Sequence, residues 1–125
     1  HGEAVIIPGG LEQSHGVRAA EAILAGGPLP TAITAFNDRL AFGIIQGLFM
    51  AGINVPKQVS VVGFDNARRH DAGLVPLTTI DQNPSLMAQL ALERAVGRAA
   101  DRYLPTQQVL VPHLVERAST STVSS

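Results

Sequence analysis

A regular alternation between short apolar runs and longer segments of helical periodicity constrains the fold of this chain more than any other feature. The run VSVVGF at 59–64 is almost continuously apolar and rich in valine, which is typical of a strand buried on both faces of a sheet. In 38–51, apolar residues recur every three or four positions, as on one face of a helix. Strands that alternate with helices form right-handed βαβ units, so we predict an α/β fold with a mostly parallel sheet and helices on both faces.

Capping and turn residues delimit the predicted elements. The predicted helices are one capped by Ser14 and ended by Gly-Gly-Pro at 26–28, one from Asp38 to Ala51 capped by Asn37, and one from Pro84 to about Tyr103. The predicted strands cover 4–7, 31–36, 59–64, 77–81, 108–111 and 114–117. Proline at position 112, between the last two strands, indicates an edge or a bend.

The composition is that of one globular domain. The chain has 125 residues, of which 46% are hydrophobic, and this length is sufficient to bury a core. Its net charge is −1 and it has no cluster of Lys or Arg, so this chain alone is not expected to bind DNA or RNA. It has no cysteine, which excludes disulfides and thiolate metal sites.

Neither a membrane span nor a signal peptide is expected. No apolar run approaches the roughly 20 residues that cross a bilayer, and the sequence starts at His1 rather than at a methionine. We therefore expect a fragment or a processed chain. The polar residues 121–125 are expected to form a disordered tail.

Two polar clusters directly follow predicted strands. Asn37 comes after the strand at 31–36, and Asp65 comes after the strand at 59–64. Ligands of open α/β sheets bind outside the carboxyl ends of the strands, so these side chains are candidates for one polar binding rim. Asp accepts hydrogen bonds and Asn both donates and accepts them, which suits a polyhydroxylated or polar heterocyclic ligand.

Both residues also have purely structural interpretations. Asn37 is a favourable helix cap, and Asp65 with Asn66 has the composition of a turn. For Asn37 the composition supports the two interpretations equally. For Asp65 the binding interpretation is favoured, because a carboxylate at the end of an apolar strand is costly unless it is paired. Gly63 would let the backbone approach a ligand closely.

No combination of residues predicts catalysis. His70 and Asp71 are adjacent in the sequence, and adjacent residues of a helix do not converge on a metal. The sequence has no G-x-S-x-G elbow, no phosphate-binding P-loop and no H-x-x-x-H pair. We therefore predict a binding protein that is not an enzyme and that uses no metal or cofactor.

Several short motifs occur in a specific order and spacing. They are PTAI, ND, AG-x-x-VP, VSVVGFD, PLTTI and LV-x-R, and they lie between about Gly16 and Thr120. In this arrangement they resemble the lac repressor/galactose repressor family of bacterial transcriptional regulators. The resemblance implies that 1–120 are the C-terminal part of an effector-binding domain, an incomplete periplasmic-binding-protein-like lobe. The N-terminal lobe and the DNA-binding domain of such a regulator would be absent from this sequence.

The resemblance also suggests roles for five residues. Asn37 and Asp65 match positions that commonly hydrogen-bond effector hydroxyls or ring nitrogens, and Gln82 matches a position near the same cleft. Gln82 is equally well explained as a loop residue that precedes a helix. Leu11 and Thr34 fall where some members place an aromatic wall. Because neither is aromatic here, stacking on a sugar is not favoured.

The function that the resemblance implies is the sensing of a small-molecule effector between two lobes. The effector would be a sugar, a sugar derivative or a purine-like compound, and its binding would modulate how a cytoplasmic homodimeric repressor binds operator DNA. The DNA would be contacted only through an N-terminal helix-turn-helix outside this sequence. The alternative is a fragment of a periplasmic-type solute-binding or sugar-binding protein, which shares the fold. The spacing of VPKQVSVVGFDN and PLTTIDQNP favours the regulator.

Overall fold

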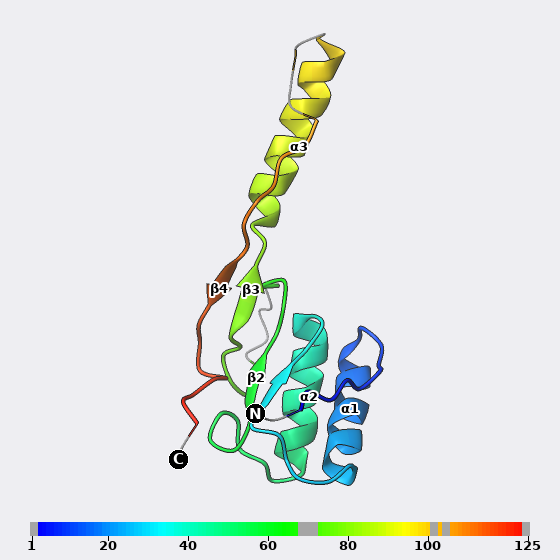
Figure 1. Ribbon diagram of the computed structural model, residues 1–125, viewed down its shortest axis with the longest axis vertical. Coiled ribbons are helices and arrows are strands. Elements are labelled where there is room, and N and C mark those ends of the chain that lie inside the picture. The colour runs from blue at the N-terminus through cyan, green and yellow to red at the C-terminus, as the bar shows by residue number, and fades with distance from the viewer. Residues whose placement is uncertain (1–2, 68–72, 101–102, 104–105, 124–125) are drawn as a thin grey trace.

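The elements of the chain follow the predicted α/β order (Figure 1). A computed structural model describes residues 3–67, 73–100, 103 and 106–123. Its helices are α1 (Gln13–Ala25), α2 (Asp38–Met50) and α3 (Pro84–Ala99), and its strands are β1 (Ala32–Thr34), β2 (Ser60–Val62), β3 (Thr79–Asp81) and β4 (His113–Val115). Within the described parts of the chain, no helix has both the length and the apolar character needed to cross a membrane.

The strands pair mostly in parallel, as predicted. β1 and β2 are parallel, with Ile33 opposite Val61. An isolated parallel bridge between Val62 and Thr78 places the start of β3 beside the end of β2. β3 then pairs with β4 in the antiparallel sense. The order β1, β2, β3, β4 therefore brings three carboxyl ends of parallel strands to neighbouring positions.

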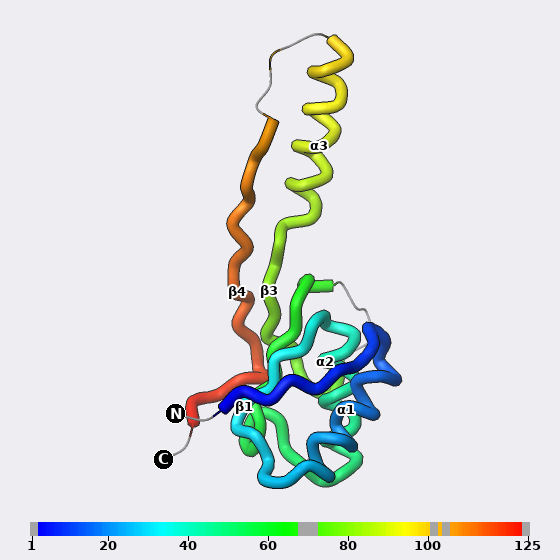
Figure 2. Tube along the Cα trace, turned by 45° about the vertical axis from the view of Figure 1, so that its right-hand side comes forward, coloured from blue at the N-terminus to red at the C-terminus, as the bar shows by residue number. Residues whose placement is uncertain are grey.

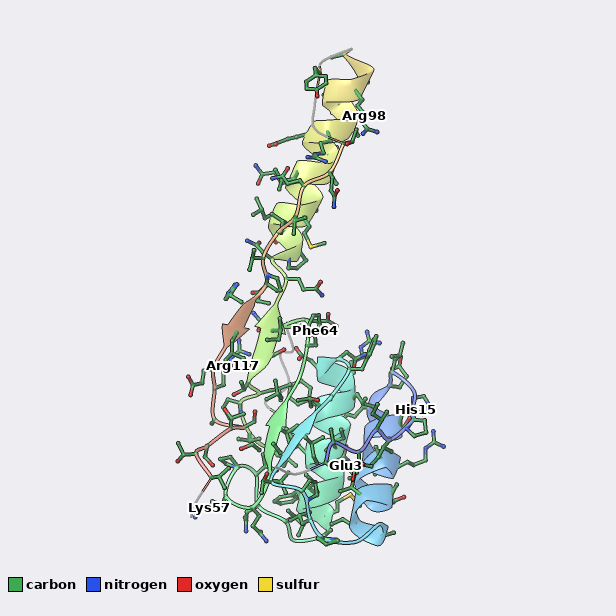
Figure 3. The ribbon with its side chains drawn as sticks, in the orientation of Figure 1. Glu3, His15, Lys57, Phe64, Arg98 and Arg117 are labelled. Carbon is green, nitrogen blue, oxygen red and sulfur yellow. The ribbon has the colours of Figure 1, made fainter. Side chains whose placement is uncertain are left out.

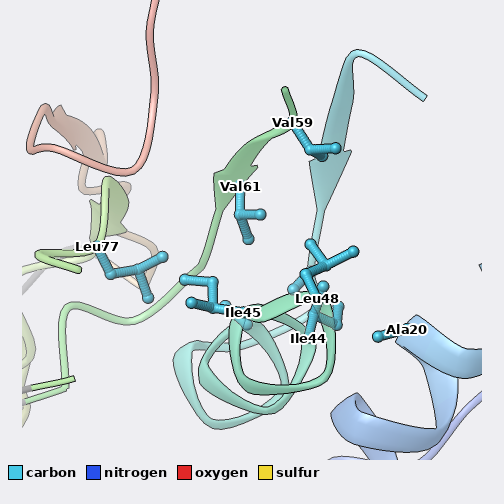
Figure 4. Packing of buried hydrophobic residues seen from close by; sticks show 9 residues of the cluster. Ala20, Ile44, Ile45, Leu48, Val59, Val61 and Leu77 are labelled. Carbon is cyan, nitrogen blue, oxygen red and sulfur yellow. The ribbon is translucent and has the colours of Figure 1, made fainter. Parts of the chain in front are cut away.

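The hydrophobic core lies where α2 packs against the sheet. Leu48 and Ile45 of α2 face Val61 of β2, and Ala20 of α1 lies beside α2 (Figure 4). Helices α1 and α2 approach closely because Gly16 and Gly43 lack side chains, and a Cβ on either would collide with the backbone of the other helix. The buried apolar residues are Ala20, Ala35, Ala41, Ile44, Ile45, Leu48, Val59, Val61 and Leu77.

Helix α3 extends away from α1, α2 and the strands, as Figures 1 and 2 show. Residues 106–112 run back alongside it, and Arg94 Nη2 donates to Gln108 Oε1 at 3.2 Å. Helix α3 and residues 106–112 have few other neighbours, so apolar side chains of α3 are exposed to solvent. Leu92 is 66% exposed and Val96 is 53% exposed.

Two predicted strands and one predicted cap are wrong. Residues 4–7 form no strand, and Ile6 is 91% exposed, because no described backbone segment hydrogen-bonds to this run. Residues 108–111 form no strand either, since they lie beside α3 rather than beside a strand. Helix α1 begins at Gln13 with Glu12 as its N-cap instead of Ser14, and Glu12 N donates to His15 Nδ1 at 3.1 Å.

The end of the chain returns to the sheet along β2. Ser119 is fully buried and bonds to both backbone groups of Val61: its Oγ donates to the carbonyl at 2.6 Å, and its carbonyl accepts from the N–H at 2.9 Å. Ser121, the first residue of the expected tail, donates its N–H to Ser60 Oγ at 3.2 Å. The hydrogen-bonded chain therefore extends at least to Ser121.

Candidate functional site

The carboxyl ends of β1, β2 and β3 meet at one edge of the sheet. The N–H of Asp38, the first residue of α2, donates to the carbonyl of Phe64 at 2.9 Å, which joins the end of β1 to the end of β2. The N–H of Asp65 donates to the carbonyl of Ile80 at 2.9 Å, which joins the end of β2 to β3. The residues that follow these strands, including Asn37 and Gln82, therefore project from the same edge.

Asn37 caps α2 and also holds the segment before α1. Its Oδ1 accepts from Leu40 N at 2.8 Å, as a helix cap does. Its Nδ2 donates to the carbonyl of Leu11 at 3.1 Å. The structural interpretation of Asn37 is thus confirmed, and Leu11 is brought to its side. Thr34 is the exposed last residue of β1.

Asp65 and Gln82 are brought together by the geometry of β2 and β3. Gln82 Nε2 donates to Asp65 Oδ1 at 3.2 Å, and the Asp65 side chain is exposed. This bond uses only one of the two oxygens of the carboxylate. The backbone of Asp65 has φ 110° and that of Asn66 has φ 50°. Residues other than glycine adopt positive φ infrequently, and Asp and Asn do so more often than most.

Asp38, the first residue of α2, is a buried carboxylate. It is 3% exposed, its Oδ1 accepts from Thr79 Oγ1 at 2.6 Å and its Oδ2 accepts from Ala67 N at 2.7 Å. A Cβ on Gly63 would collide with Asp38 Oδ1. The expected reason for Gly63, room for a ligand, is therefore corrected: this glycine makes room for the carboxylate of Asp38.

A second polar cluster joins the turn at Asp65 and Asn66 to β3 and to the segment after β4. Asn66 Nδ2 donates to Asp81 Oδ2 at 2.9 Å, and Arg117 Nη2 donates to Asn66 Oδ1 at 2.7 Å. Arg117 Nη1 donates to the carbonyl of Leu77 at 2.9 Å. Figure 3 shows Arg117 beside these strands. The hydrogen bond from Asn66, followed by one from the N–H of Asn83 at 2.6 Å, lowers the pKa of Asp81 below 3.8.

A cavity of about 880 Å³ opens beside this cluster. Asp65 lines it, whereas Gln82 lines a smaller apolar hollow against α3, and Thr34 lines a hollow beside α1. Among the described residues, no group of three or more His, Cys, Asp and Glu side chains could hold a metal ion. The large cavity is lined by Asp38, Phe42, Asp65, Asn66, Ala67, Gly73, Val75, Pro76, Leu77, Asp81, Asn83, Pro84, Ser85 and Arg117.

Sequence reasoning missed Asp38, Asp81 and Arg117 as members of the site. One signal was available for Asp81, because it ends the predicted strand at 77–81, much as Asp65 directly follows the predicted strand at 59–64. Nothing in the spacing indicates that Arg117 reaches Asn66, since 51 positions separate them in the sequence. His70 and Asp71, which are not expected to bind a metal, lie outside the described residues.

Comparison with known proteins gives a consistent family assignment. Residues 3–120 match the family model of the periplasmic binding protein-like domain. The chain is 32% identical to the HTH-type transcriptional repressor PurR of Vibrio atlanticus (strain LGP32) over 123 residues, which are 98% of this chain and 37% of that protein. It is 32% identical to the ribose operon repressor of Escherichia coli (strain K12) over 114 residues, covering 90% of this chain and 34% of that repressor.

Solved structures agree with the sequence relatives. The crystal structure of the lac repressor dimer bound to operator and the anti-inducer ONPF superposes with a TM-score of 0.81 at 29% identity. That alignment covers 89% of this chain and 39% of the lac repressor chain. The sequence described here therefore spans little more than a third of the length of the proteins that it matches.

Proposed function

We propose that this chain, which belongs to the family of periplasmic binding protein-like domains, is the effector-sensing part of a bacterial transcriptional repressor of the lac repressor/galactose repressor family. The observation that carries the proposal is the meeting of three strand ends at one edge. Asn37, Asp65 and Gln82 come from three separate segments and project from that edge. Ligands of open α/β sheets bind at such an edge.

The side chains at the edge define the chemistry of the ligand. Asp65 supplies a carboxylate oxygen that accepts hydrogen bonds, and Gln82 supplies an amide that donates or accepts them. Leu11, whose carbonyl accepts from Asn37, and Thr34, the last residue of β1, have no aromatic face. The ligand in this proposal is a small molecule rich in hydroxyls or ring nitrogens: a sugar, a sugar derivative or a purine-like compound.

The whole protein carries the remaining parts of the proposed function. Residues 1–120 serve as the C-terminal part of the effector-binding domain, and a second lobe outside this sequence closes over the ligand. The protein acts in the cytoplasm as a homodimer and contacts operator DNA through an N-terminal helix-turn-helix, also outside this sequence. It binds its effector without chemical conversion. The named relatives are repressors, which favours this proposal over a periplasmic solute-binding protein.

The test is a ligand screen followed by one matched pair of variants. The intact protein is screened by thermal shift against sugars, sugar phosphates and purines, and the affinity for the best ligand is then measured by calorimetry. Asp65→Ala should weaken binding by about 2–3 kcal/mol, because a hydrogen bond to a charged group is lost. Glu21→Ala removes an exposed carboxylate of α1 and is the control. Equal affinity of the Asp65→Ala variant and the wild type would refute the assignment.

A further inference from the structure

The turn that carries Asp65 has a backbone conformation that is uncommon outside glycine, although Asp and Asn adopt it more readily than other residues. Asp65 and Asn66 both have positive φ, and neither is glycine. Consecutive residues of this kind are strained, and they persist only where surrounding contacts determine the backbone. The contacts that hold this turn therefore help to orient the Asp65 carboxylate.

The contacts that hold the turn converge on Asn66. Its backbone N–H donates to Thr79 Oγ1 at 3.3 Å. Its side-chain amide donates to Asp81 Oδ2 at 2.9 Å and accepts from Arg117 Nη2 at 2.7 Å. Both functional atoms of this amide are used, each by a group of complementary charge, so Asn66 is fixed from two sides.

Arg117 links Asn66 to the segment that precedes β3. Its Nη2 holds Asn66, and its Nη1 donates to the carbonyl of Leu77 at 2.9 Å, just before β3. The backbone N–H of Arg117 donates to Thr78 Oγ1 at 2.9 Å, and this bond holds the backbone of Arg117 beside the start of β3. A planar guanidinium can make both side-chain bonds at once, whereas the single ammonium of lysine has no comparable fork.

We propose that Arg117 is a positioning residue for effector binding, which holds Asn66 and thereby the left-handed turn that directs the Asp65 carboxylate toward the ligand. In this proposal Arg117 acts through Asn66; because Arg117 also lines the cavity that Asp65 lines, the test must separate this action from a direct contact with the effector. This inference rests on the proposed function, because it concerns the orientation of Asp65 for the same ligand.

The test is a cycle of Arg117→Lys and Asn66→Gly in the intact protein, with affinity for the ligand identified by screening measured by calorimetry. Arg117→Lys keeps the charge but loses the bond to Asn66, and should weaken binding about tenfold. Glycine adopts positive φ without strain, and the Asn66→Gly variant lacks the amide through which Arg117 would act. Arg117→Lys should therefore cause no further loss in an Asn66→Gly background. Arg18→Lys, on the exposed surface of α1, is the control.

Each outcome of this cycle decides the inference. If Arg117→Lys weakens binding equally in the wild-type and in the Asn66→Gly background, Arg117 does not act through Asn66 and the inference is wrong. If Arg117→Lys leaves the affinity unchanged while Asp65→Ala weakens binding, the inference fails and the proposed function stands. If Asp65→Ala also leaves the affinity unchanged, the proposed function fails too. Should Arg117→Lys not fold, Asn66→Ala must weaken binding more than Asn66→Gly, and equal effects would refute the inference.

Discussion

Replacing Asp38 with alanine should destabilise the intact protein by about 3 kcal/mol, since hydrogen bonds to a charged group contribute roughly 1.5–3 kcal/mol each. Asp38 accepts two such bonds, from Thr79 Oγ1 and from the N–H of Ala67. The hydroxyl of Thr79 is fully buried and would keep no acceptor in the alanine variant. Ala67 is exposed, so water can replace part of its lost bond, and the total stays near the lower end of the sum.

Three further variants separate the buried bond from the exposed one. Asp38→Asn keeps the shape and one carbonyl acceptor, so it should cost only about 1–2 kcal/mol. Thr79→Val removes the buried hydroxyl, and the Asp38→Ala, Thr79→Val double variant should be more stable than the sum of the two single losses by about 1–2 kcal/mol. Urea unfolding followed by circular dichroism compares all four variants with the wild type. An Asp38→Ala variant within about 0.5 kcal/mol of wild type would show that this carboxylate does not hold the edge together.

Two further predictions concern pH and self-association. Because the hydrogen bond from Asn66 lowers the pKa of Asp81 in the folded state below 3.8, its stabilising effect is present above that pH and is lost as the pH falls through the folded-state value. The urea midpoint of Asp81→Asn should thus fall below that of wild type near neutral pH, and the gap should close in acid; a gap that does not depend on pH would contradict this. The isolated 125-residue chain should self-associate through the exposed apolar side of α3, and Leu92→Glu with Val96→Glu should reduce this in sedimentation experiments. A wild-type chain that sediments as a monomer when dilute would refute it.

The sequence predicts the elements of this fold well where local signals and packing agree. Asn37 caps α2, Gly52 follows it with a positive φ of 79°, and Pro84 opens α3, all as expected from capping rules. The run at 4–7 has a strand-like composition, but composition does not provide a neighbouring strand. Strand formation depends on a partner that lies far away in the sequence, and this is why the prediction fails there.

Of the site residues, only those at the ends of predicted strands could be predicted from the sequence. Asp65 is a candidate because a carboxylate ends an apolar run, and the structure pairs it with Gln82. Asn66 and Arg117 meet across 51 positions, which depends on β4 returning beside β3. Periodicity reports on local structure alone and does not contain such long-range contacts.

The most direct test of the central claim is the effect of the effector on operator binding by the intact protein. Fluorescence anisotropy with labelled operator DNA gives the affinity at increasing concentrations of the ligand found by screening. The account predicts that the ligand shifts operator affinity in the wild type, and that Asp65→Ala binds operator equally well without ligand but does not respond to it. An Asp65→Ala variant that responds at the same ligand concentration as wild type would contradict the account.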